Sequence, residues 1–583
     1  MTSIFKTQHK ISQLLELVRK NNIDSYMVSS SDEFQNEFPP SYNQRLKWLT
    51  SFTGSYGLIF ISTSQSILFT DKRYFLEAQQ HFLNIFQVSC INDYKQISNI
   101  LKHLYIKIGY DPHIFNIQLI KKWRKVLLKT QKLIPIEKNL IDTIWHRPII
   151  TKTKAPILLN SKYTGIPLNK KIKFIIQNLD TDYLLITEPN SICWLLNLRG
   201  YDANHTPIVL CYCIIKNNGY IELFASLQKI RNHYNNLLLH PFIQYKKRFL
   251  EIITQGYKIK FSKQTPIWFL QQYHQVFLTN NLCRLLQSIK NTVETSGIIF
   301  AHRQDGVAFI KLIKWINQNF NNHITEIIVI EQLIKFKNLG NLYINESFPP
   351  IAAFGKNSAV IHYHPIKIKH LKIDCSNIFL LDSGSHYKTG TTDTTRTFCF
   401  GLPKHEHKKY YTLILKCLIK LTSLHFPKNT TGSQLDGIAR EILWQHGLDY
   451  PHATGHGVGH YLSVHEGPIS LQQNNILPLK ENMIISIEPG LYFSRKYGMR
   501  IENLAIIRAS HIKNFLTFKT LTKIPMSINL IDYNLIDSTE QKWLKDYHLN
   551  IYKELAPYLE NKDKSLLKEI CTHTIKINKK HTQ

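Results

Sequence analysis

The sequence contains no long apolar run. None of its hydrophobic stretches approaches the roughly 18 residues that a membrane-spanning helix requires, and the first ten residues lack the apolar core of a secretory signal. We therefore expect a cytoplasmic protein without a membrane-bound segment.

Cysteine is sparse and shows no pairing pattern. The nine cysteines are an odd number, and none of them forms a CxxC pair. A disulfide framework and a zinc ribbon both need regular cysteine spacing, so neither is indicated. We expect reduced thiols that are mostly buried.

Acidic residues are scarce relative to basic ones, at 41 against 72, which gives a formal net charge of +31. Such a balance attracts phosphate backbones. The basic residues are spread along the chain, however, and no clustered basic helix, RNP pattern or zinc finger accompanies them. Binding to nucleic acid is therefore disfavoured.

The length of 583 residues, with 43% hydrophobic content, exceeds what one core usually holds and suggests two to four domains. An order of strand, turn, Trp, Gly and strand occurs twice. The two copies consist of Tyr26, Trp48, Gly54 and a strand over 58–61, and of Tyr183, Trp194, Gly200 and a strand over 208–211. This repeat predicts two related α/β modules, residues 1–145 and 146–285, with an insertion in the first between its opening strand and its Trp.

The third region, residues 286–583, begins with a helical pattern. Apolar residues recur every three or four positions from Val307 to Phe320, and two further helices are predicted over 410–424 and 435–442. The strands between and after these helices carry the acidic residues. The whole chain is thus expected to combine α/β modules with an α+β domain.

The first acidic pair is Asp382 and Asp393, eleven residues apart. Gly384, Gly390 and the threonine run between them make a helix improbable, so a looped pair of strands is predicted. In that arrangement the two carboxylates face each other across adjacent strands.

The second acidic pair is Glu488 and Glu502. Glu488 ends an apolar strand just before Pro489-Gly490, and Arg500 and Glu502 alternate on one side of the returning strand. Between the two pairs, glycines flank His456, which lets a histidine-bearing loop approach closely packed groups.

Each of these residues alone has a structural explanation, because strand-end acids cap turns and a single histidine is usually a satisfied core residue. Four acids that crowd together would repel one another, whereas two divalent cations neutralise them. Four carboxylates with one imidazole favour Mn, Co, Zn or Fe over a thiolate-type site. Two such ions can activate water and polarise a carbonyl together, so amide hydrolysis is indicated.

These motifs resemble the creatinase and methionine-aminopeptidase superfamily with its pita-bread catalytic fold, and specifically the long, three-domain aminopeptidase P family. The resemblance covers nearly the whole chain, including residues 68–75 and 289–295. It implies that Asp382, Asp393, His456, Glu488 and Glu502 bind two divalent metal ions, most simply Mn, with Asp393 and Glu502 as bridging ligands.

The resemblance also implies roles in the reaction. Glu488 would accept the proton of the attacking water, His362 and His465 would contact the substrate near the scissile bond, and His452 would support them. Arg500 would fix Glu502 and help to bind the substrate. The substrates would be peptides with proline at the second position, and the protein would be a homodimer through its catalytic domain, with Trp444 near the interface.

Three alternatives share much of this pattern: a prolidase-like Xaa-Pro dipeptidase, a methionine aminopeptidase, and a non-catalytic binding protein of the same fold. The two N-terminal modules argue against the much shorter methionine enzyme. The five occupied ligand positions argue against a binding protein. The chain departs from the family pattern at Ser385-His386, Lys388-Thr389 and Ala453, which affects the expected substrate range more than the reaction type.

Overall fold

The chain folds into two compact units in this computed structural model. The first comprises Met1–Asn160 and Ile166–Arg284, and the second comprises Ser161–Gly165 and Leu285–Gln583. The structure describes residues 3–82, 85–102, 106–148, 154–226, 237–273, 275, 277–320, 323–365 and 370–580. Within these ranges no helix is long and apolar enough to cross a bilayer.

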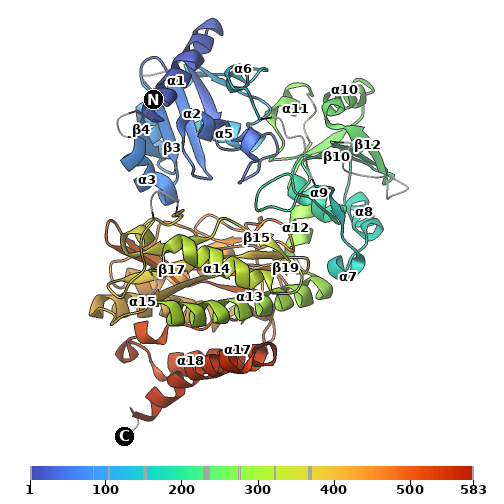
Figure 1. Cartoon of the computed structure of the whole chain (residues 1–583). Helices are drawn as coiled ribbons and strands as arrows, with labels where there is room; N and C mark the ends of the chain where they lie inside the picture. Colours follow the sequence, from blue (N-terminus) through green and yellow to red (C-terminus); the bar gives the residue numbers. More distant parts are fainter. Residues whose placement is uncertain are drawn as a thin grey trace. The chain divides into compact units, whose positions relative to one another are not determined.

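The first unit contains two six-stranded sheets with the same topology (Figure 1). One has the order β4-β3-β2-β1-β5-β6, and the other has the order β12-β11-β10-β8-β13-β14. In both, the third strand pairs antiparallel with its two neighbours, and the outer pairs are parallel. The predicted relationship between the two modules is therefore confirmed.

The strand bounds of the two sheets are as follows. In the first sheet they are β1 (Ser25–Ser29), β2 (Gly57–Ser62), β3 (Ile67–Thr70), β4 (Gln87–Cys90), β5 (Lys107–Tyr110) and β6 (Lys132–Pro135). In the second they are β8 (Tyr183–Ile186), β10 (Tyr212–Lys216), β11 (Ile221–Ala225), β12 (Leu237–Pro241), β13 (Ile259–Ser262) and β14 (Phe277–Thr279).

The strand predicted over 208–211 is wrong, because strand β10 begins only at Tyr212. The backbone N–H of Val209 donates to the sulfur of Cys193, and that of Leu210 donates to a carboxylate oxygen of Asp202. Side chains therefore take up the donors that a sheet would have used. Apolar content alone did not reveal this competition.

The predicted insertion in the first module packs against the second module. The ring of Phe34 lies 5.4 Å from that of Tyr212 and 5.2 Å from that of Phe242. The Tyr212 hydroxyl donates to the carbonyl of Glu33 at 2.7 Å. The insertion thus fastens the two modules of the first unit together.

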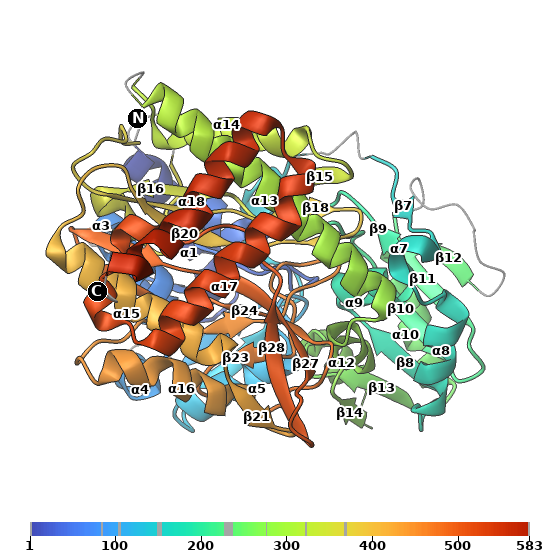
Figure 2. The ribbon, with the colours of Figure 1, turned by 90° about the horizontal axis from the view of Figure 1, so that it is seen from below.

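Six long helices frame the second unit. They are α13 (Thr292–Asn319), α14 (Glu326–Asn338), α15 (His405–Thr422), α16 (Gly432–Trp444), α17 (Ser538–Leu555) and α18 (Asn561–Lys580). The three helices predicted from periodicity correspond to α13, α15 and α16. Helices α17 and α18 run side by side and both contact α13 (Figure 2).

Antiparallel strands between these helices carry the acidic residues. Strand β17 (Ile378–Asp382) lies between β16 (Ile351–Phe354) and β20 (Thr395–Cys399). A four-stranded sheet has the order β21 (His425–Pro427), β28 (Phe515–Thr520), β27 (Asn503–Ala509) and β24 (Ile484–Ile487), and a hairpin joins β25 (Gly490–Phe493) to β26 (Tyr497–Arg500). Helix α14 packs against β16, and α13 packs against the short β19 (Gly390–Thr391).

Arg396 of β20 is fully buried and joins the strands to the C-terminal helices. Its guanidinium donates to the carbonyls of Ile524 at 2.7 Å and Glu502 at 2.6 Å, and to the Tyr547 hydroxyl of α17 at 2.7 Å. Arg396 directly follows Thr395 on β20, and its contact with the Glu502 carbonyl joins β20 to the segment that carries Glu502. The arginine therefore holds these two acidic segments in register.

Replacing Arg396 with Met should lower the free energy of unfolding by about 3 kcal/mol, because several buried acceptors lose their donor. Urea unfolding followed by tryptophan fluorescence measures the effect. Arg508→Met, at a partly exposed position of β27 where the arginine donates only to the Asn482 side chain among the described residues, is the matched control and should change the unfolding free energy by less than about 1 kcal/mol. Equal losses in the two variants would contradict this account of Arg396.

Candidate metal centre

The first two predicted acids meet at one edge of a strand pair. Asp382 is the last residue of β17, and its partner in the antiparallel register is Thr395 of β20. Asp393 stands two residues before Thr395, between β19 and β20. The predicted looped strand pair is thus present, and both carboxylates are buried at its end.

The other two acids meet in the same way at the end of another strand pair. Glu488 directly follows β24 and Glu502 directly precedes β27, and Ile487 pairs with Asn503 in the antiparallel register. The expected returning strand is divided, because Arg500 ends β26 and Ile501 separates it from Glu502.

His456 reaches the acids because its loop lies directly against β24. It forms the two-residue strand β22 with Gly455, where an added Cβ would lie 1.8 Å from the carbonyl oxygen of Ser486. Only glycine permits that approach. The His456 Nδ1 lies 3.0 Å from the Gly457 carbonyl, which makes it the protonated nitrogen and turns Nε2 towards the acids.

The five residues converge. His456 Nε2 lies 3.4 Å from Asp393 Oδ2 and 3.4 Å from Glu488 Oε1. Two groups have all their ligand atoms within 4.8 Å of one another and together contain all five residues, namely His456 with Glu488 and Glu502, and Asp382 with Asp393 and Glu502.

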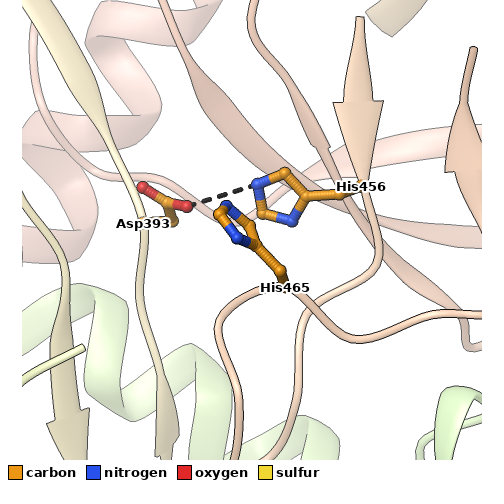
Figure 3. Close-up of side chains that lie close together, drawn as sticks. All are labelled: Asp393, His456 and His465. Atoms are coloured by element: carbon orange, nitrogen blue, oxygen red, sulfur yellow. Dashed lines mark ion pairs between the residues drawn. The ribbon is translucent and has the colours of Figure 1, made fainter. Parts of the chain in front are cut away.

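His465 joins a third group, with Asp393 and His456. Its ring lies 4.4 Å from that of His456 at a steep angle, and Figure 3 shows the two imidazoles and the Asp393 carboxylate pointing towards a common region from different sides. His465 is therefore at the centre itself, as a substrate-contacting residue would need to be.

The crowding of the acids shifts the pKa values of residues in the cluster. Burial, together with Asp393 and Glu488, raises the pKa of Asp382 to about 7 despite the opposing charge of Arg500. Burial and neighbouring carboxylates also raise the pKa of Glu502 well above its usual range. Burial alone would lower the pKa of His456, but Asp393 and Glu488 raise it to about 9.

The donor set fits divalent cations. Asp382 Oδ1 and Glu502 Oε1 are buried, and within the described part of the chain neither accepts a hydrogen bond. A buried carboxylate oxygen left without a donor is unfavourable unless a cation binds it. Four carboxylates and one imidazole suit Mn, Zn, Co or Fe.

Arg500 contacts one acid directly and a second through a hydroxyl group. Its Nη2 donates to Asp382 Oδ2 at 2.5 Å, and it reaches Glu502 only through Thr395, whose hydroxyl receives the Arg500 Nε–H at 3.0 Å and donates to Glu502 Oε2 at 3.0 Å. Arg500 therefore acts on Glu502 through one intervening hydroxyl, and its direct ion pair is with Asp382. Strand β26 ends there and directs the arginine across to β17.

Tyr492 is a residue that the sequence reasoning missed. Its hydroxyl accepts a hydrogen bond from Arg500 Nη1 at 2.7 Å and lies 2.9 Å from His452 Nε2. The other ring nitrogen of His452 faces the Ala453 carbonyl at 2.8 Å, so Nε2 accepts from the tyrosine. It lies opposite Gly498 in the β25–β26 hairpin, a pairing that only the structure reveals.

Two other predicted positions lie outside the ligand cluster. His362 is half-buried in the turn after the 3-10 helix Gly355–Ala359 and joins none of the three groups. That helix is attached to β26 through Ser358, whose hydroxyl accepts from the Gly498 N–H at 2.8 Å. Trp444 is 52% exposed at the end of α16.

All nine cysteines are free, and seven are buried, as expected.

Comparisons with known proteins cover nearly the whole chain. The sequence model of Metallopeptidase family M24 matches residues 297–509, and that of the C-terminal region of peptidase M24 matches 514–574. The Creatinase/Prolidase N-terminal domain matches twice, over 10–144 and 146–294.

Similar proteins have nearly the same length. The chain is 30% identical to the probable Xaa-Pro aminopeptidase P of Coprinopsis cinerea, over 96% of this chain and 97% of that one. It is 32% identical to the probable Xaa-Pro aminopeptidase P of Talaromyces marneffei, over 96% and 91%. The crystal structure of the X-prolyl aminopeptidase of Caenorhabditis elegans, described as a cytosolic enzyme with a di-nuclear active site, matches with a TM-score of 0.91 and 28% identity over 98% of this chain and 100% of that one.

Proposed function

The chain belongs to metallopeptidase family M24, and we propose that it is an Xaa-Pro aminopeptidase that hydrolyses the bond between an N-terminal residue and a following proline. The predicted fold class, two creatinase-like modules followed by a pita-bread domain, is confirmed by the family matches. The observation that carries the proposal is the convergence of four carboxylates, three of them buried and that of Glu488 partly buried, with one imidazole at the ends of two strand pairs.

Asp382, Asp393, His456, Glu488 and Glu502 would hold two divalent metal ions. Mn is our first choice because the donors are mostly carboxylates, and Zn, Co and Fe are the others. When bound, such ions activate water and polarise the carbonyl of the scissile amide. The di-nuclear site described for the Caenorhabditis elegans relative supports this proposal.

Glu488 is the candidate general base. Its carboxylate adjoins His456 at 3.4 Å and accepts from the Ser486 hydroxyl at 3.2 Å, which leaves its orientation fixed. Burial raises its pKa, and the chemistry needs a carboxyl that takes a proton from water and passes it to the leaving nitrogen. His465 beside it, with His362 and His452, would contact the substrate.

Arg500 and Tyr492 would orient the centre. Arg500 fixes the orientation of Asp382 through an ion pair and that of Glu502 through the Thr395 hydroxyl. Through the Tyr492 hydroxyl, Arg500 is also linked to the His452 ring. The amide before proline carries no N–H. A substrate site for this bond therefore needs a pocket for the ring and contacts to the carbonyl, which histidines can supply.

Organisation and location are part of the same proposal. The domains would be residues 1–145, 146–285 and 286–583. The cytosolic description of the Caenorhabditis elegans enzyme supports a cytoplasmic location. A homodimer would use the catalytic domain, where the exposed Trp444 offers an aromatic contact, and nucleic acid is not a proposed ligand.

A panel of substrates separates this function from the prolidase-like dipeptidase, the methionine aminopeptidase and the non-catalytic protein. With added Mn, the purified protein should cleave an Xaa-Pro-Pro peptide and leave an Xaa-Pro dipeptide, a Met-Ala peptide and labelled DNA unchanged. Mass spectrometry of the products measures cleavage, and a gel shift measures DNA binding. Preferred cleavage of the dipeptide would reassign the chain to the dipeptidases, and no cleavage at all would favour a binding protein.

A further inference from the structure

A second buried polar cluster lies directly behind the loop that joins the two aspartates. Its centre is Lys337 of α14, whose side chain is fully buried. Lys337 Nζ donates to Glu346 Oε2 at 2.9 Å, to the Ser383 hydroxyl at 2.7 Å and to the Gly384 carbonyl at 3.3 Å. Ser383 and Gly384 immediately follow Asp382, so the lysine binds the start of the loop directly after the first aspartate.

Asp305 of α13 binds residues of the same loop, including the one just before the second aspartate. Its carboxylate accepts hydrogen bonds from the hydroxyls of Thr392 at 2.8 Å and Ser385 at 2.7 Å. Thr392 immediately precedes Asp393. The side chain of Asp305 is 3% exposed, and its Oδ1 lies 3.8 Å from Lys337 Nζ.

The cluster is costly to bury, which suggests a role other than stability. One ammonium and two carboxylates are removed from water, and the Coulomb attraction within such groups often does not repay their desolvation. What the cluster does supply is a fixed geometry: two rigid helices each bind a residue adjacent to an aspartate. None of its members belongs to the ligand groups.

We propose that Lys337 and Asp305 are positioning residues for the metal centre, which hold Asp382 and Asp393 at the separation that two cations require. The inference rests on the proposed metal site. Before metal binds, the two carboxylates repel each other and would spread apart. The ammonium and the helix-borne carboxylate fix the backbone on both sides and so keep the carboxylates close.

The test measures metal affinity rather than activity. Lys337→Met and Thr392→Val should each weaken Mn²⁺ binding to the metal-free protein by about 10- to 100-fold in calorimetric titration, as loss of groups that orient metal ligands does. Thr392→Ser keeps the hydroxyl that donates a hydrogen bond to Asp305, so this variant should bind Mn²⁺ with nearly native affinity. Lys335→Met, at an exposed position on the same helix, should bind Mn²⁺ as the native chain does.

Opposite outcomes are distinguishable. If Lys337→Met and Thr392→Val lower the melting temperature but bind Mn²⁺ with native affinity, the cluster is only structural and the inference is overturned. Native affinity in Thr392→Val alone would overturn the role of Asp305. If the native chain itself binds no Mn²⁺, the proposed function fails first, and the native arm of the titration reveals that directly.

Discussion

Replacing Glu488 with Gln should reduce kcat on an Xaa-Pro-Pro peptide by about 100- to 10,000-fold, because a positioned general base contributes about 10²- to 10⁴-fold. Glutamine has the same shape and can still accept the hydrogen bond from the Ser486 hydroxyl that Glu488 receives at 3.2 Å. It cannot take a proton from water. The loss should therefore appear in kcat, with KM changed much less.

The matched control is Glu481→Gln, an exposed acid that precedes the same strand. It should retain native kcat. Steady-state kinetics with saturating Mn separates loss of the base from weaker metal binding, and circular dichroism confirms that both variants fold. A Glu488→Gln enzyme with kcat within tenfold of the native value would remove Glu488 from the role of base.

Local sequence signals predicted the acids because each of them lies next to the end or the start of a strand. Asp382 and Glu488 both follow an apolar run, which stops at Ser383-Gly384 in the first case and at Pro489-Gly490 in the second. The glycines around His456 predicted that its loop lies close to other backbone segments. In the structure, a Cβ added at Gly455 would lie only 1.8 Å from a backbone oxygen. These features depend on neighbours in the chain, so the sequence reveals them.

The supporting contacts were not predictable in the same way, because they join residues far apart in sequence. Arg500 pairs with Asp382 across 118 positions, and Asp305 accepts from Thr392 across 87. No local pattern says which strand a side chain will face once sheets assemble. Alternation assigned Arg500 to the side of Glu502, whereas the end of β26 turned it to β17.

The two N-terminal modules illustrate the same limit. Repeated Trp and Gly positions predicted their kinship, and two sheets of identical strand order confirm it. The repeat did not predict where strand β10 begins, because Cys193 and Asp202 capture the preceding N–H groups. Hydrophobicity fixes which segments are buried, but hydrogen-bond competition decides which of them become strands.

Removal of metal should abolish peptide cleavage and destabilise the protein increasingly as the pH rises. The raised pKa of Asp382, about 7 against 3.8 when unfolded, means that the folded metal-free protein binds a proton more tightly than the unfolded chain. That contribution to stability is complete below about pH 4 and is lost as the pH rises through about 7. The raised pKa of His456 extends the loss to about 9.

Bound cations replace those protons, so the gain in stability on adding Mn²⁺ should be larger at pH 8 than at pH 6. At a concentration 100 times the dissociation constant, each site adds about 2.7 kcal/mol to the free energy of unfolding. Differential scanning calorimetry of chelator-treated and Mn²⁺-loaded protein at the two pH values measures the difference. A gain that is equal at both, or larger at pH 6, would contradict the argument.

Glu502→Gln isolates the cause, because it removes one of the repelling charges without changing the shape. Its amide oxygen can still accept from the Thr395 hydroxyl, which lies 3.0 Å from Glu502 Oε2. The metal-free variant should therefore be more stable than the metal-free native chain at pH 8, and should gain less from Mn²⁺. A variant that is less stable than the native chain without metal would show that the carboxylates are held by donors rather than strained by their mutual repulsion.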